Sequence, residues 1–562
     1  MSTQSKEIPT VWTIGRTDVL ETGTWRSATP FYEWRPSPCH VECPVGNDIP
    51  SWIAHVGTGT LEEGWRRLVE TNPFPAVTGR VCHHPCEGHC NRGALEAAVG
   101  INGLEQYLGD VALERGWALP KSGPDQDRCV AVVGGGPAGL SCAYHLRRFG
   151  YAVTVFETQS LLGGLLRYGI PPYRLPPEVV DQEIQRVLDL DVDVRLDARV
   201  ATASAFEELR DAYDAVFVAV GAQRARRLAD LEESAGCAFV LDGLEYLRRC
   251  TEDAACDIGA RVVVIGGGSA AMDVARTALR MGAEAVSVVY RRQREQMPAM
   301  PEEVEQALDE GVVLYDRAIV ATAQTAEDGT TLSCTCQKVT VADGTTSGGP
   351  RLTPVEGGEF PVEADVIVAA IGQDPDLDGL GRALQWQEGI LEVDPVTLAT
   401  SLPGVFAGGD VSSEARYVSD AIGAGRRAAY SIASYLGHPE AEAPERYTLD
   451  EAVNRKQVNL DYFYHADRND RGKVPAQERL RGFAEAVSPY TSQVAADEAA
   501  RCMTCGVCVE CDNCFVFCPD LAIKKDPNGD ERYVVLEQYC KGCGICAAEC
   551  PRGVVRLEQV TR

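Results

Sequence analysis

The sequence predicts an α/β protein in which two nested parallel-sheet domains lie between two small cysteine-rich modules. Two glycine-rich turns, near residues 134 and 266, each follow an apolar strand-like run. Val/Ile-rich runs alternate with helical segments from about residue 128 to 440, which is typical of parallel α/β domains. The cysteines gather toward the two ends of the chain, where residues 39–90 and 502–550 hold fifteen of the 22.

The composition excludes several classes of protein. The chain has 562 residues, 24% of them charged and 45% apolar, which predicts several globular domains rather than disorder. Its formal net charge of −29 argues against nucleic acid as the main partner and favours small molecules or basic protein surfaces. Neither a signal peptide nor a transmembrane helix is predicted. Clustered cysteines without a secretion signal indicate metal ligation in a reducing compartment, so we expect a cytoplasmic protein.

Five stretches differ in composition, and we expect each to be a structural unit. In chain order they are a small α-helical cysteine-containing domain (1–120), a first α/β domain (121–240 and 360–440), a second α/β domain inserted into it (241–359), a polar linker (441–495) and a compact α+β cysteine module (496–562).

The first glycine turn lies in CVAVVGGGPAGLSCAYHLRRFGYAVTVFE, residues 129–157, where a strand, a turn, a helix and a second strand ending in an acid follow one another. In a G-x-G-x-x-G turn the first glycine permits the tight turn, the second lets the backbone approach a pyrophosphate, and the third lets helix and strand pack closely. The helix N-terminus faces the phosphates, and the acid accepts hydrogen bonds from a ribose. The residues expected to form this Rossmann-like site for a flavin dinucleotide are Gly134, Gly136, Pro137, Ala138, Gly139 and Glu157.

The second glycine turn lies in a similar unit, residues 260–292, with Gly266, Gly268, Ser269 and Ala271 as the expected contacts of a nicotinamide dinucleotide. Tyr290 stands where an acid would end the second strand, and Arg291 and Arg292 follow it. A carboxylate would repel a 2′-phosphate, whereas guanidinium groups can clamp one. NADPH is therefore favoured, and NADH stays possible because both arginines can also be solvated surface charges.

Two later segments complete the nested arrangement. Buried strands enter glycine turns at Gly221 and Gly372, as expected where the chain crosses between the two domains. In LPGVFAGGDVSSEARYVSDAIGAGRRAA, Gly409 and Asp410 follow a strand, and a helix containing Ala421 begins at about residue 419. Asp410 is expected to hydrogen-bond a flavin ribityl or phosphate group, and the alternative is an ordinary turn aspartate.

The tail carries the most specific motif in the chain, a doubled C-x2-C-x2-C-x3-C-P run. In this bacterial ferredoxin pattern the fourth cysteine ligates the other cluster, so two 4Fe–4S clusters are predicted. A zinc ribbon would use two pairs rather than two proline-flanked quartets, which disfavours zinc. One predicted ligand set is Cys508, Cys511, Cys514 and Cys550, and the other is Cys540, Cys543, Cys546 and Cys518.

Three further segments resemble a known family: GGLLRYGIPPYRLP (163–176), VVYRRQREQMPAMPEE (288–303) and PGVFAGGD (403–410). They look like the small, β subunit family of NADPH-dependent glutamate synthase, which includes the N-terminal half of dihydropyrimidine dehydrogenase. The resemblance implies FAD at the first turn, NAD(P)H at the second, hydride transfer to the flavin, and onward transfer to iron–sulfur clusters. It also places Gly164, Leu165 and Arg167 in the flavin site.

The same resemblance extends to an N-terminal domain with two clusters. Carried over, the ligands of one cluster are Cys43, Cys82, Cys86 and the oxygen of Glu105. An oxygen ligand is unusual for such a cluster, so the alternative is that Glu105 is a plain helix-surface residue.

The ligands of the second N-terminal cluster are incomplete in this region. The family supplies two cysteines upstream, where this chain has Phe31 and Trp34, so that only Cys39 and Cys90 remain. EAARCMTCG (498–506) resembles the run that carries the missing pair. We therefore expect Cys502 and Cys505 to complete this cluster. The alternative is that the cluster was lost, which leaves Cys39 and Cys90 as free thiols and Cys502 and Cys505 as packing residues of the tail.

The predicted function is that of an electron-transfer subunit, in which NAD(P)H reduces FAD and 4Fe–4S clusters relay electrons to a ferredoxin or partner redox enzyme; the sequence leaves the reverse direction of flow open. Residues 163–176 contain no cysteine pair, which disfavours thiol–disulfide exchange, and no catalytic acid or base is required. A glutamate synthase small subunit is one alternative, although it needs no ferredoxin-like tail. A redox sensor or scaffold is another, and reduction by NADPH would distinguish it.

Overall fold

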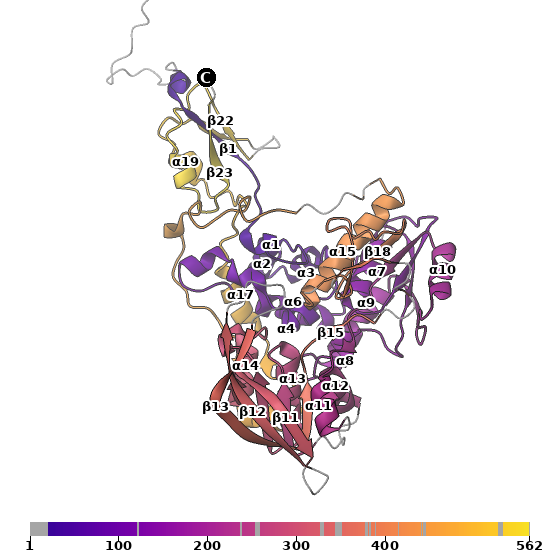
Figure 1. Cartoon of the computed structure of the whole chain (residues 1–562). Helices are drawn as coiled ribbons and strands as arrows, with labels where there is room; N and C mark the ends of the chain where they lie inside the picture. The colour runs from indigo at the N-terminus through magenta and orange to yellow at the C-terminus, as the bar shows by residue number, and fades with distance from the viewer. Residues whose placement is uncertain are drawn as a thin grey trace, which may run out of the picture.

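The computed structural model describes residues 21–120, 123–236, 239–252, 259–325, 331–342, 351–376, 380, 384–387, 389–413, 415–439, 441, 446–526 and 532–560. A narrow lobe, formed by the C-terminal module and the first described residues, projects from a broad body (Figure 1). The body holds the helical domain and the two α/β domains. No helix among these residues is long and apolar enough to cross a membrane.

The first α/β domain has a parallel five-stranded sheet in the order β18-β5-β2-β3-β4. Its strands are β2 (Cys129–Val133), β3 (Ala152–Phe156), β4 (Asp193–Arg195), β5 (Ala215–Val218) and β18 (Val405–Ala407). Its helices are α7 (Pro137–Arg148), α8 (Leu165–Tyr168), α9 (Pro177–Leu188), α10 (Ala203–Ala212) and α15 (Val418–Tyr435). Strand β18 belongs to the sheet of the first domain but follows the second domain in the chain. The second domain is therefore inserted into the first.

The second α/β domain repeats this plan with the strand order β10-β9-β8-β14-β7, again all parallel. Its strands are β7 (Val240–Asp242), β8 (Arg261–Ile265), β9 (Ala285–Tyr290), β10 (Val313–Asp316) and β14 (Val366–Ala369). Its helices are α11 (Ala229–Ala235), α12 (Gly243–Glu252), α13 (Ser269–Arg280) and α14 (Pro301–Asp309). An antiparallel sheet of β11 (Ala318–Thr325), β12 (Leu332–Ala342) and β13 (Arg351–Ala364) joins this domain.

The N-terminal helical domain packs directly on the first α/β domain. One continuous apolar core contains Trp52 and Leu108 from the former and Val130, Leu140 and Ile432 from the latter. The helices are α1 (Pro38–Val41), α2 (Ile49–Thr58), α3 (Leu61–Val69), α4 (Pro75–Val81), α5 (Pro85–Gly88) and α6 (Ile101–Glu114). Because the two units share a core, their cofactor sites are held in a fixed relation.

The lobe differs from the sequence-based boundaries at one strand. Strand β1 (Ala28–Tyr32) falls within the stretch expected to be the N-terminal domain, yet it pairs antiparallel with β23 (Val555–Gln559) of the tail. An exposed edge strand leaves backbone N–H and C=O groups without partners, and β1 supplies partners for those of β23. The lobe also contains α18 (Asn513–Val516), α19 (Ile545–Ala548), β21 (Ile523–Lys525) and β22 (Tyr533–Val535).

The polar stretch before the tail wraps over the helical domain. Its elements are β19 (Gly472–Lys473), α16 (Ala476–Arg479), β20 (Val487–Ser488) and α17 (Ser492–Ala500). Arg471 donates hydrogen bonds to the Gly79 carbonyl (3.1 Å) and to Gln106 (3.0 Å) of the helical domain. The same stretch reaches the second α/β domain, where Arg479 lies 2.9 Å from Glu310.

Glu310 is a buried carboxylate that faces three guanidinium groups. Arg276 and Arg280 of α13 each donate two hydrogen bonds to it, at 2.7–3.0 Å, and Arg479 comes from the wrapping segment. Burial alone would raise the pKa of the Glu310 carboxyl, but hydrogen bonds from Arg280 and Arg276 outweigh it and leave that pKa below its ordinary value. The ion cluster therefore ties α13, α14 and the wrapping segment together.

Glu310→Gln is expected to lower the free energy of unfolding of the second α/β domain by roughly 3–5 kcal/mol, because three guanidiniums lose their buried counterion. The depressed pKa means that the contribution of Glu310 is present at neutral pH and is lost as the pH falls through the folded-state value. Thermal and urea unfolding from pH 7 to 4 would measure both effects. Asp309→Asn, at an exposed neighbouring carboxylate 3.9 Å from Arg479, is the control and should change stability little. Equal losses for the two variants would contradict this account.

Candidate active site and electron-transfer centres

The first glycine turn has the geometry that each of its glycines was expected to provide. Gly134 has φ +116°, and a Cβ there would lie 2.3 Å from the Ala219 carbonyl oxygen. A Cβ at Gly139 would lie 1.9 Å from the Gly134 carbonyl oxygen, so the helix and strand touch. At Gly136 the nearest atom to such a Cβ is 3.9 Å away, which leaves open space above the turn.

A cavity of about 970 Å³ begins at this turn and extends to the second one. Its lining includes most residues predicted to bind the flavin: Gly134, Gly136, Pro137, Ala138, Glu157, Gly164, Leu165, Gly221, Gly372, Gly409, Asp410 and Ala421. Gly268 and Ser269 of the second turn line the same cavity, and so do Cys82 and His83. One continuous space therefore joins both nucleotide turns to a predicted cluster ligand.

The donor set of this cavity fits a flavin dinucleotide. The open space over Gly136 meets the first turn of α7, where backbone N–H groups can receive a pyrophosphate. Glu157 directly follows β3, and its carboxylate accepts hydrogen bonds from the backbone N–H groups of Gly135 (2.7 Å) and Gln159 (2.8 Å). Burial raises the pKa of Asp410 to about 6, opposed by the positive charge of Arg416.

Arg167 lies outside this arrangement. Its Nε donates to the Leu162 carbonyl (2.8 Å), its guanidinium pairs with Asp181, and it lines a separate, smaller cavity. In the structure its contacts fix the loop before α8 rather than face the flavin cavity.

The second glycine turn has the same geometry as the first. Gly266 has φ +152°, and a Cβ there would lie 2.2 Å from the Ala370 carbonyl oxygen, whereas nothing lies within 4 Å of one at Gly268. Ala271, in the third glycine position, is fully buried. The Tyr290 ring packs over Gly267, and its hydroxyl donates to the Gln296 carbonyl (2.8 Å).

The two arginines after Tyr290 are free to meet a phosphate. Arg291 is exposed, Arg292 is partly buried, and neither forms an ion pair within the described part of the chain. The buried Nε of Arg292 has no hydrogen-bond partner there.

A buried ion cluster between the two domains was not foreseen from the sequence. Arg174 contacts Asp273 (2.6 Å) and pairs with Glu303, and all three side chains line the large cavity. Burial raises the pKa of Asp273 to about 6, opposed by the charge of Arg174. Arg174 and Glu303 belong to the segments that carry the family resemblance, and these charged residues within the motifs were the available signal.

The first N-terminal ligand set converges on a small cavity. Cys43, Cys82, Cys86 and Glu105 line it together, and the charges of Cys43 and Cys82 raise the pKa of Cys86 beyond the effect of burial. Glu105 is buried rather than on a helix surface. Its Oε1 accepts hydrogen bonds from Asn72 and Thr78, both 2.8 Å, which leaves Oε2 for a metal.

The second ligand set is brought together from both ends of the chain. Burial raises the pKa of the Cys39 thiol, and the nearby charges of Cys90, Cys502 and Cys505 raise it further. Asn91 donates a hydrogen bond to the Cys505 sulfur (3.4 Å). The four thiols are thus neighbours, as the cluster completed by Cys502 and Cys505 requires.

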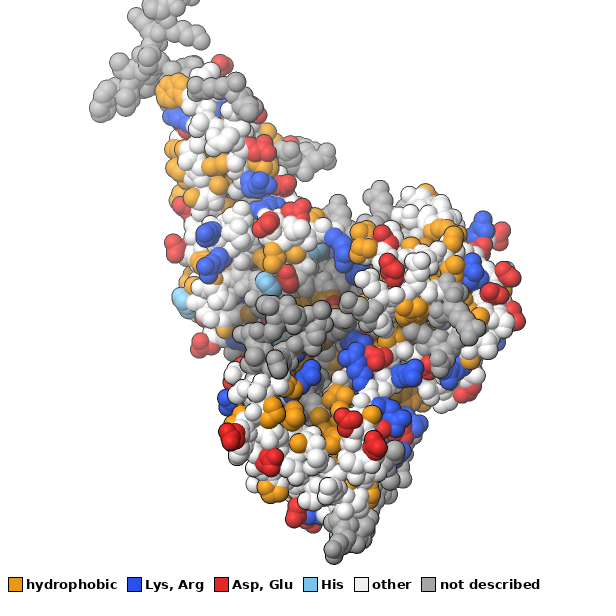
Figure 2. Space-filling model, in the orientation of Figure 1, with side chains coloured by type: hydrophobic (Ala, Val, Ile, Leu, Met, Phe, Trp, Pro, Cys, Tyr) orange, Lys and Arg blue, Asp and Glu red, His pale blue; other side chains and the backbone are white. Residues whose placement is uncertain are grey.

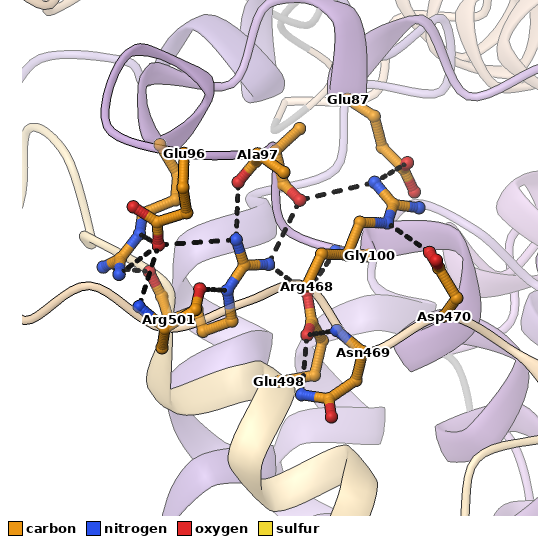
Figure 3. Close-up of polar contacts among 12 residues, drawn as sticks. Glu87, Glu96, Ala97, Gly100, Arg468, Asn469, Asp470, Glu498 and Arg501 are labelled. Carbon is orange, nitrogen blue, oxygen red and sulfur yellow. Dashed lines mark hydrogen bonds and ion pairs between the residues drawn. The ribbon is translucent and has the colours of Figure 1, made fainter.

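Helix α17, which precedes Cys502, is anchored by a buried polar network (Figure 3). Arg501 donates to the carbonyls of Ala97 (2.6 Å), Ala98 (3.2 Å) and Ala466 (2.9 Å) and pairs with Glu498 (2.6 Å). Glu498 in turn accepts a hydrogen bond from the Gly100 N–H (2.7 Å). These bonds fix the C-terminal cysteine pair against the N-terminal domain.

The tail places its eight cysteines in two groups with the exchanged fourth member. The charges of Cys550, Cys508 and Cys511 raise the pKa of Cys514 beyond the effect of burial, and those of Cys518 and Cys543 do the same for Cys540.

Hydrophobic side chains are exposed on this lobe (Figure 2), among them Val516 at 65% and Leu521 at 64% exposure. Within the described ranges, no group of three or more His, Cys, Asp or Glu side chains is arranged to hold a single metal ion.

Comparison with known proteins agrees with this geometry. A family model for pyridine nucleotide-disulphide oxidoreductases matches residues 128–428, and one for the 4Fe–4S domain II of dihydropyrimidine dehydrogenase matches residues 28–117. The chain belongs to the pyridine nucleotide-disulphide oxidoreductase family. The predicted resemblance and the predicted fold class are therefore confirmed.

Three relatives show the breadth of this family. The chain is 36% identical to the NADP(+)-dependent formate dehydrogenase subunit beta of Moorella thermoacetica, over 84% of this chain and 70% of that one. It is 33% identical to the NADPH-Fe(3+) oxidoreductase subunit beta of Geobacter sulfurreducens, over 84% and 76%. It is 36% identical to the glutamate synthase [NADPH] small chain of Azospirillum brasilense, over 72% and 87%.

Proposed function

We propose that this protein is an NADPH-dependent electron-transfer subunit, which exchanges electrons between NADPH and a partner redox protein through FAD and four 4Fe–4S clusters. The observation that carries the proposal is the single cavity that joins the first glycine turn, the second glycine turn and Cys82. The names of its relatives, two of them β subunits of NADP-linked oxidoreductases, agree with it.

In this proposal FAD, when bound, supplies a hydride acceptor that can release two electrons one at a time. The residues of the chain hold and orient the reactants. The open turn at Gly136 receives the pyrophosphate, Glu157 faces the ribose, and the Arg174 ion pairs hold the second domain beside the first. No side chain has to act as a strong acid or base.

Electrostatic neighbours suggest an order for the clusters. Cys82 borders the flavin cavity, and the charge of Cys39 acts on Cys86, so the two N-terminal ligand sets are adjacent. The charges of Cys502 and Cys505, from the bridging ligand set, and those of Cys511 and Cys550, from the tail, all act on Arg552. The charge of Cys514 acts on Cys546 of the last set. The set with Cys39 is therefore the proposed bridge between flavin side and tail.

Anaerobic titration with NADPH would test the proposal. We expect loss of flavin absorbance and the appearance of reduced-cluster signals in electron paramagnetic resonance spectra. Dithionite reduction of clusters that NADPH cannot reduce, even at excess, would instead indicate a sensor or scaffold. A glutamate synthase small subunit would leave the two tail clusters without a role.

Cofactor choice gives a second expectation. Arg291→Ala with Arg292→Ala should lower kcat/KM for NADPH by roughly 10- to 100-fold and change that for NADH little, because the lost contacts reach only the 2′-phosphate. Steady-state reduction of ferricyanide with each nucleotide would measure this. Arg249→Ala, at an exposed position of α12 in the same domain, is the matched control. An equal loss with both nucleotides would contradict a 2′-phosphate site.

The partner and the compartment follow from the same chemistry. The proposed partner is a redox protein that meets the lobe, where the outermost thiols, Cys511 and Cys543, are exposed. We place the protein in the cytoplasm because clustered thiols that ligate iron require a reducing compartment.

A further inference from the structure

A second large cavity lies beside the flavin cavity and has no role in the proposed electron transfer. Its volume is about 1080 Å³, and its walls are the outer face of α15, the loop after α1, and the hairpin of β16 (Trp386–Gln387) and β17 (Ile390–Leu391). It meets the flavin cavity at Gly409, Asp410 and Ala421. Residues of both α1 and α15 line it.

Three of the arginines that line this cavity are electrostatic neighbours. Arg426 and Arg427 lie on α15, and Arg446 lies on the segment that follows it. The buried Nε atoms of Arg426 and Arg427 have no hydrogen-bond partner among the described residues. Arg426 donates to the Val45 carbonyl (2.9 Å), but Arg427 forms no hydrogen bond or ion pair with any residue that the structure describes.

Among the described residues, Asp420 is the one group that offsets the charge of Arg427. Burial and the positive charges of Arg446 and Arg426 together lower the pKa of Arg427 to about 10, against the opposing charge of Asp420. Asp420 stands two turns earlier on the same helix face, and its buried Oδ2 also lacks a partner in the described part of the chain. The Cys43 thiol is among the groups that act on Arg426 and is not among those that act on Arg427.

Other charges line the cavity without changing this balance. The carboxylates of Glu42, Glu392 and Asp410 are on its walls, but none is among the groups that offset Arg427. Leaving a guanidinium unpaired in a mostly buried position is costly, so its retention points to an external anion. Apolar side chains, including Ile390 and Leu398, form another part of its wall.

We propose that this cavity binds a phosphate ester of nucleotide size. Its phosphate would be held by Arg426, Arg427 and Arg446, since converging guanidiniums match the several oxygens of a phosphate. A hydroxyl or amino group of the ligand would donate to Asp420, and its organic part would pack on the apolar wall. The site is independent of the proposed electron transfer, although its ligand would lie next to both the flavin cavity and Cys43.

Calorimetric titration of the FAD- and cluster-loaded protein with inorganic pyrophosphate and with AMP would test this site. Saturating NADP⁺ is present throughout, to block the second glycine turn. We expect one site per chain, and Arg427→Gln should weaken binding by about tenfold or more. In phosphate-free buffer the same variant should unfold at the same or a higher temperature than the parent, because an unpaired buried cation has been removed.

Arg210→Gln, on α10 far from the cavity, is the matched control and should bind like the parent. Reduction by NADPH, measured in parallel, should be unchanged in Arg427→Gln without ligand, which separates this inference from the electron-transfer proposal. Three results would overturn the site: no binding of either probe, binding that Arg427→Gln leaves unchanged, or equally tight binding of sulfate and citrate at matched ionic strength.

Discussion

Replacing Cys502 and Cys505 together by serine is expected to remove one complete cluster from the protein. The parent should contain about sixteen irons per FAD and the variant about twelve, since the four proposed cubanes hold four irons each. Because the affected cluster is the proposed bridge to the tail, NADPH should still reduce the flavin while the tail clusters stay largely oxidised. Iron and acid-labile sulfide analysis, with electron paramagnetic resonance after NADPH addition, would measure both effects.

The control for this experiment is Cys129→Ser. Cys129 is partly exposed at the start of β2, and its sulfur lies 3.7 Å from Asp214, outside every proposed ligand set. It should keep the parental iron content. About twelve irons in the parent and in the double variant alike would mean that Cys39, Cys90, Cys502 and Cys505 hold no cluster. Electrons would then reach the tail by a shorter chain of centres.

Gly136→Val is expected to weaken the affinity for FAD by roughly 100-fold or more without unfolding the domain. Gly136 has an extended backbone (φ −82°, ψ −175°) that valine can adopt, and a Cβ there has no protein atom closer than 3.9 Å. The valine methyl groups would instead occupy the space proposed for the pyrophosphate. FAD absorbance per chain and circular dichroism of the purified variant would separate cofactor loss from unfolding.

Gly268→Val is the matched partner in the second turn. It has the same extended backbone (φ −89°, ψ 174°) and open surroundings. It should retain FAD, be reduced by dithionite, and lose reduction by NADPH. If Gly136→Val kept a full complement of FAD, or if Gly268→Val lost FAD instead, the assignment of the two turns would be wrong.

Local motifs explain why much of this protein was predictable. A strand, a glycine turn and a helix place their phosphate-binding groups within a few residues, so the sequence alone determined both nucleotide turns. The tail quartets likewise contain the spacing of their ligands. The sequence left open whether Glu105 is a surface residue, and burial in the helical domain decided that it is not.

Only the tertiary structure determines which segments that are distant in the sequence contact one another. Cys39 and Cys90 meet Cys502 and Cys505 only because Arg501 and Glu498 tie α17 to the N-terminal domain. Strand β1 pairs with the edge strand β23 of the tail. Arg427 lines the cavity beside α15, and its buried Nε has no hydrogen-bond partner among the described residues. Such contacts depend on the packing of whole domains, which no short sequence pattern encodes.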